Sequence, residues 1–344
     1  MGKDVCPGQP RPGGVKAVGL MSGGLDSALA VKIMTDLGVD VIGVTFVLPW
    51  DDREPLQVSA LARQLGIPLE VFALEADYIE MLKAPCYGYG VAFNPCMDCH
   101  LFMMKKAAQY MRDTGAELLF TGEVVGQRAM SQRRECLRVL EKAAGLEGRL
   151  LRPLSARLLA PTIPEEEGRI DRSRLLGLSG RGRREQFFLA KQWGITAFSP
   201  PGGGCLLTEV PFGRKMKDFL QFGFRDYRET AILRWGRYFR VSPDFVAVLG
   251  RDEHENDQLM KSAHPDDLMM TLSEDRPGPL LILKGVSPSP DILSLAAGLV
   301  QYYSKYKEAA LQPVDYARLD RPADWSSVMP VRLEERQIRQ WRMG

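Results

Sequence analysis

The sequence predicts an α/β protein that contains a doubly wound parallel sheet and a second, smaller α+β domain. Strand-like and helix-like stretches alternate through the first part of the chain, which is typical of a parallel sheet with crossover helices. A glycine-rich turn joins the first strand-like stretch to the first helix-like stretch, as at the ligand-binding edge of such sheets. From Arg152 onward prolines interrupt any long element, and this change predicts a separate domain further on. We expect a flexible tail over residues 1–14, a first domain over 15–210 and a second domain over 211–344.

The expected elements follow from apolar runs and from the residues that end them. Val39–Leu48 is a β-prone run that Pro49 ends, and Gly38 ends the helix before it. Pro95 stands at the first turn of another helix, and Gly115 lies beyond its end. The expected strands of the first domain are Val15–Met21, Val39–Leu48, Leu69–Leu74 and Glu117–Phe120, and its helices are Ala28–Met34, Glu54–Leu65, Asp77–Lys83 and Pro95–Arg112. For the second domain we expect strands at Arg237–Val241 and Phe245–Leu249 and helices at Glu253–Ser262 and Arg332–Arg342, and within the first domain a surface turn at Glu165–Gly168.

Composition limits the classes of function. Among 344 residues, 45 basic and 43 acidic side chains give a net charge of +2, so RNA would have to bind through local patches. No apolar run approaches the roughly 20 residues that span a bilayer, and residues 1–14 lack the apolar core of a signal peptide. Six cysteines without secretory features indicate metal or thiol chemistry in a reducing compartment. We therefore expect a cytoplasmic enzyme with no membrane contact.

The glycine turn has the sequence Ser22-Gly23-Gly24-Leu25-Asp26-Ser27. Its glycines permit positive φ and close approach of the backbone, and the following helix start offers unpaired N–H groups to an anion. Ser22 and Ser27 add hydroxyl donors, and Asp26 can hold Mg²⁺ against phosphate oxygens. The pattern has neither the Gly-Lys-Ser/Thr ending of a P-loop nor the G-x-G-x-x-G spacing of a dinucleotide fold. A plain glycine turn with a serine cap is the structural alternative, and pyrophosphate is the ligand that the pattern favours.

Three cysteines form the second candidate site. Cys96 and Cys99 lie three residues apart at an expected helix start, where unpaired N–H groups favour thiolates. Cys205 follows three glycines and two prolines, where the backbone can approach another body closely. Three thiolates could hold a [4Fe-4S] cluster and leave one iron open to an extra sulfide. Zinc with His100 as fourth ligand, or a persulfide or disulfide relay between Cys205 and either other thiol, remains an alternative.

The stretch Thr121–Gln132 follows an expected strand and should line the same cleft as the glycine turn. Gly122 falls at the carboxyl end of its strand, as Ser27 falls just beyond the end of the first. We expect Arg128 near phosphate and Gln127, Ser131 or Gln132 near a base or ribose. A helix start capped by Ser131 is the structural alternative, and both interpretations can hold together.

The hexapeptide Ser22–Ser27 resembles the PP-loop of the ATP pyrophosphatase superfamily, which shares the adenine nucleotide alpha hydrolase-like fold. Together with Asn94-Pro95-Cys96-Met97-Asp98-Cys99 it resembles the tRNA thiouridine synthases, of the 2-thiouridylase and 4-thiouridine synthase branches and of an iron–sulfur-dependent type. The resemblance implies that ATP adenylates a uridine carbonyl oxygen, that pyrophosphate leaves, and that sulfur then displaces AMP. Where 2-thiouridylases carry Asn, this chain has His100, and Cys205 lies in an unfamiliar Gly-Gly-Gly-Cys-Leu-Leu-Thr context, so the uridine and the modified carbon stay open.

The resemblance also assigns site residues. It places Asp26 and the three cysteines in catalysis, and it implies ATP, Mg²⁺, a tRNA and a sulfur donor, either sulfide or a cysteine desulfurase. The oligomeric state stays open, with a homodimer as one option. The rival hypotheses are a sulfur transferase or amidase for a small cofactor precursor, and a non-catalytic RNA-binding protein. The expected cofactor-binding residues are Ser22, Gly23, Gly24, Asp26, Ser27, Gly122, Gln127 and Arg128, and the expected metal ligands are Cys96, Cys99 and Cys205.

Basic stretches favour the tRNA hypothesis. Arg169–Lys191 holds seven basic against two acidic residues, and Ser179–Arg184 is its densest part, suited to phosphates. Arg214–Arg240 interleaves basic residues with aromatic ones, of which we expect most rings to be buried and the charges to meet RNA. Gly250-Arg251 with Asn256 resembles a signature of the RNA-binding domain of ribosome-quality-control proteins. That resemblance implies an RNA-binding second domain.

Overall fold

The computed structural model describes residues 14–51, 55–199, 205–273 and 276–344. All of the expected tail except Gly14 lies outside the described residues, as do Glu54 and the glycines just before Cys205. The chain divides into two compact units, and each is described by itself. The first unit comprises Met1–Leu48, Arg53–Gly90 and Pro95–Gly204, and the second comprises Pro49–Asp52, Val91–Asn94 and Cys205–Gly344.

The first unit contains a five-stranded sheet in the order β3-β2-β1-β4-β5. Every pair of neighbouring strands in it is parallel, which confirms the predicted fold class. Because β2 and β3 lie on one side of β1 while β4 and β5 lie on the other, the order of connection reverses between β1 and β4. Ligands of open α/β sheets bind at such a switch point. The strands are β1 (Lys16–Leu20), β2 (Asp40–Val47), β3 (Leu69–Ala73), β4 (Leu118–Thr121) and β5 (Leu150–Leu151).

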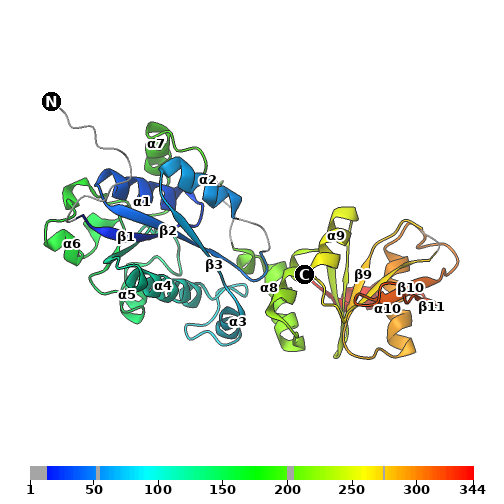
Figure 1. The fold of residues 1–344 in the computed structure, drawn as a ribbon. Coiled ribbons are helices and arrows are strands. Elements are labelled where there is room, and N and C mark those ends of the chain that lie inside the picture. The colour runs from blue at the N-terminus through cyan, green and yellow to red at the C-terminus, as the bar shows by residue number, and fades with distance from the viewer. Residues whose placement is uncertain (1–13, 52–54, 200–204, 274–275) are drawn as a thin grey trace. The chain divides into compact units, whose positions relative to one another are not determined.

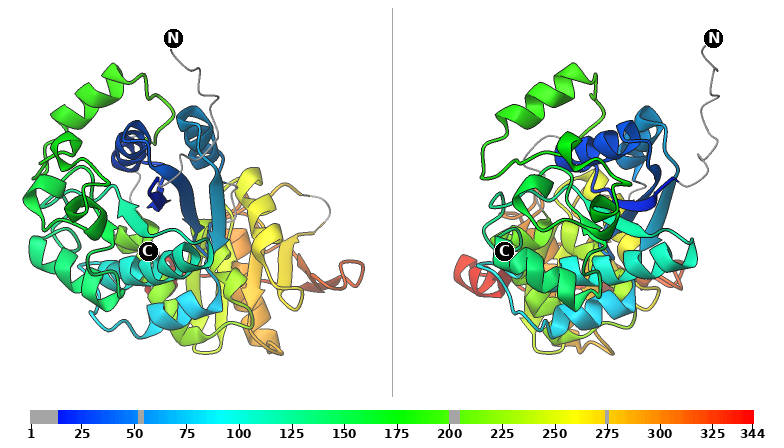
Figure 2. Two further views of the ribbon diagram at one scale, coloured as in Figure 1. Left: turned by 60° about the vertical axis from the view of Figure 1, so that its left-hand side comes forward. Right: turned by 90° about the vertical axis from the view of Figure 1, so that its left-hand side faces the viewer.

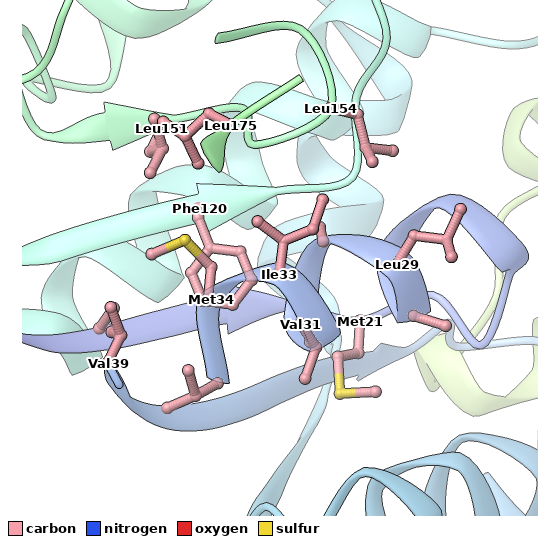
Figure 3. Close-up of a cluster of buried hydrophobic side chains, with 14 of the residues drawn as sticks. Met21, Leu29, Val31, Ile33, Met34, Val39, Phe120, Leu151, Leu154 and Leu175 are labelled. Atoms are coloured by element: carbon pink, nitrogen blue, oxygen red, sulfur yellow. The ribbon is translucent and has the colours of Figure 1, made fainter. Parts of the chain in front are cut away.

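Helices cover both faces of this sheet, as Figure 1 and the two further views of Figure 2 show. Alternate residues of one strand enter different cores: Phe120 packs with Leu29 and Met34 of α1, whereas Leu119 packs with Met104 of α4. Figure 3 shows the first of these cores. Burial on both faces explains why the strands have continuous apolar sequences. The helices are α1 (Leu25–Asp36), α2 (Leu56–Leu65), α3 (Ala76–Lys83), α4 (Cys96–Asp113), α5 (Arg134–Ala143), α6 (Ile163–Glu166) and α7 (Arg184–Gln192), with 3₁₀ turns at Ala156–Leu158 and Arg172–Arg174.

Two local expectations in this unit need correction. Of the expected surface turn, Glu167 and Gly168 form an exposed turn, but Glu165 and Glu166 belong to helix α6. Thr162 and Glu165 form a capping box, and Glu165 is buried. The carboxylate of Glu165 also pairs with Arg172, a partner that the local sequence does not indicate. Ser131 does not cap α5, because that helix begins at Arg134, and Ser131 is buried instead.

The second unit contains a seven-stranded sheet in the order β11-β10-β8-β9-β7-β6-β12, with antiparallel neighbours throughout. Helix α10 packs its apolar side chains, among them Leu293 and Leu299, against this sheet. The C-terminal helix is shorter than expected because Arg342 and Met343 pair with β6 as a strand. The elements are α8 (Val210–Phe222), β6 (Arg237–Ser242), β7 (Phe245–Leu249), α9 (Glu253–Ser262), β8 (Leu268–Leu272), β9 (Leu281–Lys284), α10 (Pro290–Tyr302), β10 (Val314–Arg318), β11 (Ser326–Val328), α11 (Glu335–Trp341) and β12 (Arg342–Met343), with 3₁₀ segments at Leu206–Thr208 and Tyr227–Arg234.

The aromatic residues of Arg214–Arg240 contribute largely to the interior of the second unit. Phe219, Tyr238 and Phe239 are fully buried, and the other four rings are half-buried. Arg240 donates to Asp218 at 2.8 Å, and Arg234 donates to Asp51 at 2.6 Å. These two arginines are therefore engaged in ion pairs within the protein.

The signature residues Gly250 and Asn256 fix the start of β9. The N–H of Gly250 donates to the carbonyl oxygen of Leu280, and the N–H of Leu280 donates to Oδ1 of Asn256. Their spacing thus has a structural role within this unit. No helix in the described part of the chain is long and apolar enough to cross a bilayer.

Candidate functional site

The Ser22–Ser27 turn joins the carboxyl end of β1 to α1. Gly23 has a φ of +75°, and a Cβ there would lie 2.9 Å from a methyl group of Val58, so both conformation and space require glycine. Gly24 is the N-cap of α1, and no side chain caps the helix. The hydroxyl of Ser27 donates to the carbonyl oxygen of Gly24 at 2.8 Å, while Ser22 is exposed. The turn therefore presents a helix N-terminus that no protein side chain caps, beside a serine hydroxyl, which suits an anion.

Asp26 lies in the first turn of α1 and has two unlike carboxylate oxygens. Oδ2 accepts a hydrogen bond from Nε2 of Gln127 at 2.7 Å and lies 3.6 Å from Nη2 of Arg183. Oδ1 is buried and has no hydrogen-bond partner. A buried carboxylate oxygen without a partner is costly, and a hard cation such as Mg²⁺ prefers oxygen ligands of this kind. The structure thus leaves on Asp26 an oxygen that fits a metal ion.

Gly122 brings β4 against the same helix turn. A Cβ at this position would lie 2.5 Å from the backbone carbon of Asp26 and 2.5 Å from the backbone nitrogen of Ser27. Only glycine permits this approach, by which the carboxyl ends of β1 and β4 meet at the switch point. Glycine is thus required here for packing whether or not Gly122 touches a ligand.

The arginine-rich loop Ser179–Arg184 also lies at this edge of the sheet. The N–H of Gly180 donates to the carbonyl oxygen of Val125 at 2.8 Å, and Arg183 reaches Asp26. Nε2 of Gln186 donates to Oε1 of Gln127 at 3.4 Å, which extends the contact to α7. Sequence reasoning assigned this loop to RNA and did not place it beside Asp26. Three arginines beside two glycines indicated phosphate binding, but did not indicate which phosphate.

Residues of the Thr121–Gln132 stretch differ in whether they contact the Ser22–Ser27 turn. Gln127 contacts Asp26, and Gly122 contacts the turn, so the structure brings these two predicted residues to the Ser22–Ser27 turn. Arg128 is exposed, and the structure shows no contact between its side chain and Asp26.

The cysteine pair begins helix α4. Cys96 is its first residue, and the hydroxyl of Tyr78 donates to Sγ of Cys99 at 3.2 Å. Asp98, between them, is buried and accepts hydrogen bonds from the backbone N–H groups of Cys86 and Tyr87, at 2.7 and 3.0 Å. This carboxylate fixes the preceding loop onto the start of α4. Both thiols are half-buried.

Cys205, the third predicted ligand, belongs to the second unit and is exposed. Among the described residues, no group of three His, Cys, Asp or Glu side chains is arranged to hold a metal ion. Cys96 and Cys99 are thus present as a pair of soft donors in the first unit, and the three-thiol set stays a prediction.

His100, the residue after Cys99, belongs to an ionic network with Glu123 and Arg152 that sequence reasoning missed. Oε1 of Glu123 lies 3.2 Å from Nδ1 of His100, and Oε2 accepts from Nε of Arg152 at 3.0 Å. Burial alone would raise the pKa of Glu123, but the hydrogen bond with His100 and the charge of Arg152 outweigh it and lower the pKa to about 2. Glu123 therefore stays ionised and holds His100, which is the residue where the chain departs from the thiouridylase pattern. Its position directly after the Thr121-Gly122 strand end was the available signal.

A parallel sheet with a glycine turn and an acidic first helical turn at its switch point is an arrangement that suits nucleotide binding. Two family models match parts of the chain. Residues 15–144 match the tRNA methyl transferase HUP domain, and residues 236–342 match the NFACT protein RNA binding domain. Residues 15–144 are thus similar to a HUP domain and residues 236–342 to an NFACT-type RNA-binding domain, and each match covers less than half of the chain.

Curated relatives of this chain are tRNA-specific 2-thiouridylases named MnmA. That of Xanthobacter autotrophicus is 32% identical over 150 residues, which cover 38% of each chain. That of Chloroflexus aggregans is 34% identical over 134 residues, covering 34% of this chain and 36% of the relative. The chain thus spans little more than a third of the length of the curated relatives that it matches. Among solved structures, a complex of 4-thiouridine synthetase with RNA and bound ATP is 25% identical, with a TM-score of 0.41 over 58% of this chain and 46% of that one.

Proposed function

We propose that this protein is an ATP-dependent tRNA sulfurtransferase that converts a uridine to a thiouridine. The observation that carries the proposal is the buried Oδ1 of Asp26, which has no hydrogen-bond partner. Asp26 lies at the start of a helix that no side chain caps, in a chain similar to tRNA 2-thiouridylases. The carbonyl oxygen of uridine is a poor leaving group. Adenylation attaches AMP to this oxygen, and AMP is a good leaving group. The anion site at the Ser22–Ser27 turn suits the pyrophosphate that this step releases.

Each residue at the turn has a role in this proposal. The backbone N–H groups from Gly23 to Ser27 bind pyrophosphate, and the hydroxyl groups of Ser22 and Ser27 add donors. Oδ1 of Asp26 holds Mg²⁺, which neutralises phosphate charge when bound. Gln127 orients Asp26 through the 2.7 Å hydrogen bond, and Arg183 adds positive charge where pyrophosphate departs. Gly122 permits the packing of β4 on the turn. We propose the exposed Arg128 as a further contact to phosphate.

The thiols supply the sulfur chemistry. We propose Cys96, Cys99 and Cys205 as ligands of a [4Fe-4S] cluster, which when bound would present sulfide to the activated uridine. The pair at the start of α4 supports this proposal because soft thiolates at a helix N-terminus suit such ligands. Zinc with His100, or a persulfide relay among the same thiols, is the competing assignment, and metal analysis separates them.

The partners follow from the same proposal. The RNA substrate is a tRNA, and the NFACT-type domain supports its binding. The sulfur comes from sulfide or a cysteine desulfurase, and the enzyme works in the cytoplasm, where tRNA and reduced thiols occur together. A homodimer is compatible with the proposal and is not required by it.

The position at which ATP is cleaved tests the proposal. We expect ATP labelled at the α phosphate to yield AMP, with formation of pyrophosphate, only when unmodified tRNA is added. Asp26→Ala should abolish the turnover, whereas Asp36→Ala, at the exposed end of the same helix, should leave it unchanged. ADP as the product, or AMP formation that a small cofactor precursor supports and tRNA does not, would contradict the proposal and favour the rival small-molecule acceptor.

A further inference from the structure

The outer face of helix α7, in the first unit, carries two exposed aromatic rings between two cations. Residues at positions i, i+3, i+4 and i+7 of a helix share one face, and on α7 these positions are Arg184, Phe187, Phe188 and Lys191. Phe188 is 68% exposed, more than any other aromatic side chain in the described part of the chain, and Phe187 is 43% exposed. We name these four residues the α7 stripe.

The opposite face of α7 anchors the helix to the first unit. Gln186 and Ala190 are buried, and Leu189 and Trp193 pack against the core that contains Leu29 of α1. Figure 1 shows α7 at the outside of this unit, beside α1. The inner face therefore holds the helix in place, and packing of the core does not account for the phenylalanines on its outer face.

The α7 stripe is open to a ligand. The ring of Phe187 contacts Phe198, with centroids 6.5 Å apart at an interplanar angle of 52°. Within the described residues, no other ring and no cation lies over the ring of Phe188, and the side chains of Arg184 and Lys191 take part in no hydrogen bond or ion pair. The stripe therefore presents an uncovered ring face and two unpaired charges to solvent.

The start of α7 lies next to the proposed catalytic residues. Arg183, directly before the stripe, has its Nη2 3.6 Å from Oδ2 of Asp26. From the inner face of the helix, Gln186 donates to Gln127 at 3.4 Å, and Gln127 in turn donates to Asp26 at 2.7 Å. A ligand on the α7 stripe would therefore lie beside the site at which the proposed adenylation takes place.

We propose that Phe188 is a substrate-selecting residue, on which an unpaired base beside the target uridine stacks while Arg184 and Lys191 contact the flanking phosphates. Residues 179–192 hold four cations and one carboxylate, that of Glu185, so this surface attracts a polyanion rather than a protein of ordinary charge. A phenylalanine ring stacks on a base without a hydrogen bond, so it selects an unpaired base of any identity. Bases inside a duplex cannot reach the ring. The proposal rests on the proposed function in taking tRNA as the RNA, and it adds that the target uridine lies in a loop and not in a paired arm.

The test is direct binding by the full-length chain without ATP. The probes are a fluorescent RNA hairpin with an unpaired loop and a blunt RNA duplex of the same length. Phe188→Leu should weaken binding of the hairpin roughly 5- to 100-fold and leave binding of the duplex unchanged, whereas Phe188→Tyr, which keeps a ring, should bind both as the wild type does. Lys191→Ala should lower the logarithmic salt slope for the hairpin by roughly 0.7, as expected for one phosphate that is no longer neutralised.

Lys105→Ala is the matched control for the charge. Lys105 is exposed on α4, which packs on the other face of the sheet, so its loss should leave the salt slope unchanged. Because Phe188 and Lys191 are exposed, their variants should unfold in urea as the wild type does. Hairpin binding by Phe188→Leu that equals wild type, or an equal loss for hairpin and duplex, would overturn the proposal. A wild-type protein that self-associates without RNA and becomes monomeric with Phe188→Leu would overturn it in favour of an interface between copies of the chain.

Failure of the α7 stripe and failure of the enzyme proposal give different results. Thiouridine formation by Phe188→Leu with an unchanged KM for tRNA would contradict the role of the stripe and leave the enzyme proposal standing. Hairpin binding that needs Phe188 and Lys191, in a protein that makes no thiouridine, would support the stripe and contradict the enzyme proposal.

Discussion

Replacing Gly122 with alanine tests whether the contact between β4 and α1 shapes the nucleotide site. The added Cβ would lie 2.5 Å from the backbone carbon of Asp26 and 2.5 Å from the backbone nitrogen of Ser27, where ordinary contact begins at 3.4 Å. The overlap of about 0.9 Å is with backbone, so rotation of a side chain cannot relieve it and the strand or the helix must move. Overpacking of this kind costs about 1–3 kcal/mol. A shift of this size at Asp26 would also disturb the anion site.

Two measurements check this prediction. In urea unfolding, Gly122→Ala should lose about 1–3 kcal/mol of the free energy of unfolding, and its KM for ATP should rise because the backbone donors of the Ser22–Ser27 turn are displaced. Gly182→Ala is the matched control, since nothing lies within 4 Å of a Cβ there and its φ is not positive. It should change stability by less than about 0.5 kcal/mol. A Gly122→Ala protein as stable as the wild type, with an unchanged KM for ATP, would refute the reasoning.

Three further predictions concern the charges and the thiols. Asp26→Asn should abolish Mg²⁺-dependent ATP cleavage, which calorimetric titration with Mg²⁺ checks. Its free energy of unfolding, measured in urea, should stay the same or rise, because a buried oxygen without a partner loses its charge. Because folding lowers the pKa of Glu123 from 4.5 to about 2, this carboxyl contributes about 3 kcal/mol of stability that is fully present above pH 4.5 and is lost as the pH falls through 2. Glu123→Gln removes one of the two carboxylates that pair with buried Arg152, Glu141 being the other, so the variant should be destabilised at pH 7. The difference from wild type in urea unfolding should shrink between pH 4.5 and 2, and a constant difference would contradict this assignment. Cys99→Ser should lose the iron that anaerobic reconstitution adds, whereas Cys136→Ser on α5 should keep it, and equal iron in both, or zinc in the wild type, would contradict the cluster.

Local signals were enough to place the strands and the turn of the first unit. The run Val39–Leu48 is observed as β2, ending at Val47, because Pro49 cannot continue the strand and burial on both faces demands a continuous apolar sequence. Pro95 before Cys96 gave the start of α4 for an equally local reason. Elements that depend on residues near one another in the chain were therefore predictable.

Contacts between distant residues were not. Arg183 lies 157 positions after Asp26, and the Glu123–Arg152 pair joins residues 29 apart, so no local pattern indicates either contact. The buried Glu165 shows the same limit, because a run of three glutamates resembles a solvated turn until the partner Arg172 is known. Long-range ion pairs form only after the chain has folded, and they decide which charged residues face inward.

The central claim is that the protein replaces a uridine oxygen with sulfur. Mass spectrometry of nucleosides tests it, on tRNA incubated anaerobically with ATP, Mg²⁺, sulfide and reconstituted protein. We expect a uridine heavier by the difference between sulfur and oxygen, which disappears with Asp26→Ala and with replacement of any of the three proposed ligand cysteines. ATP cleavage to AMP with no thiolated nucleoside in the tRNA would contradict the claim and direct attention to a small-molecule acceptor.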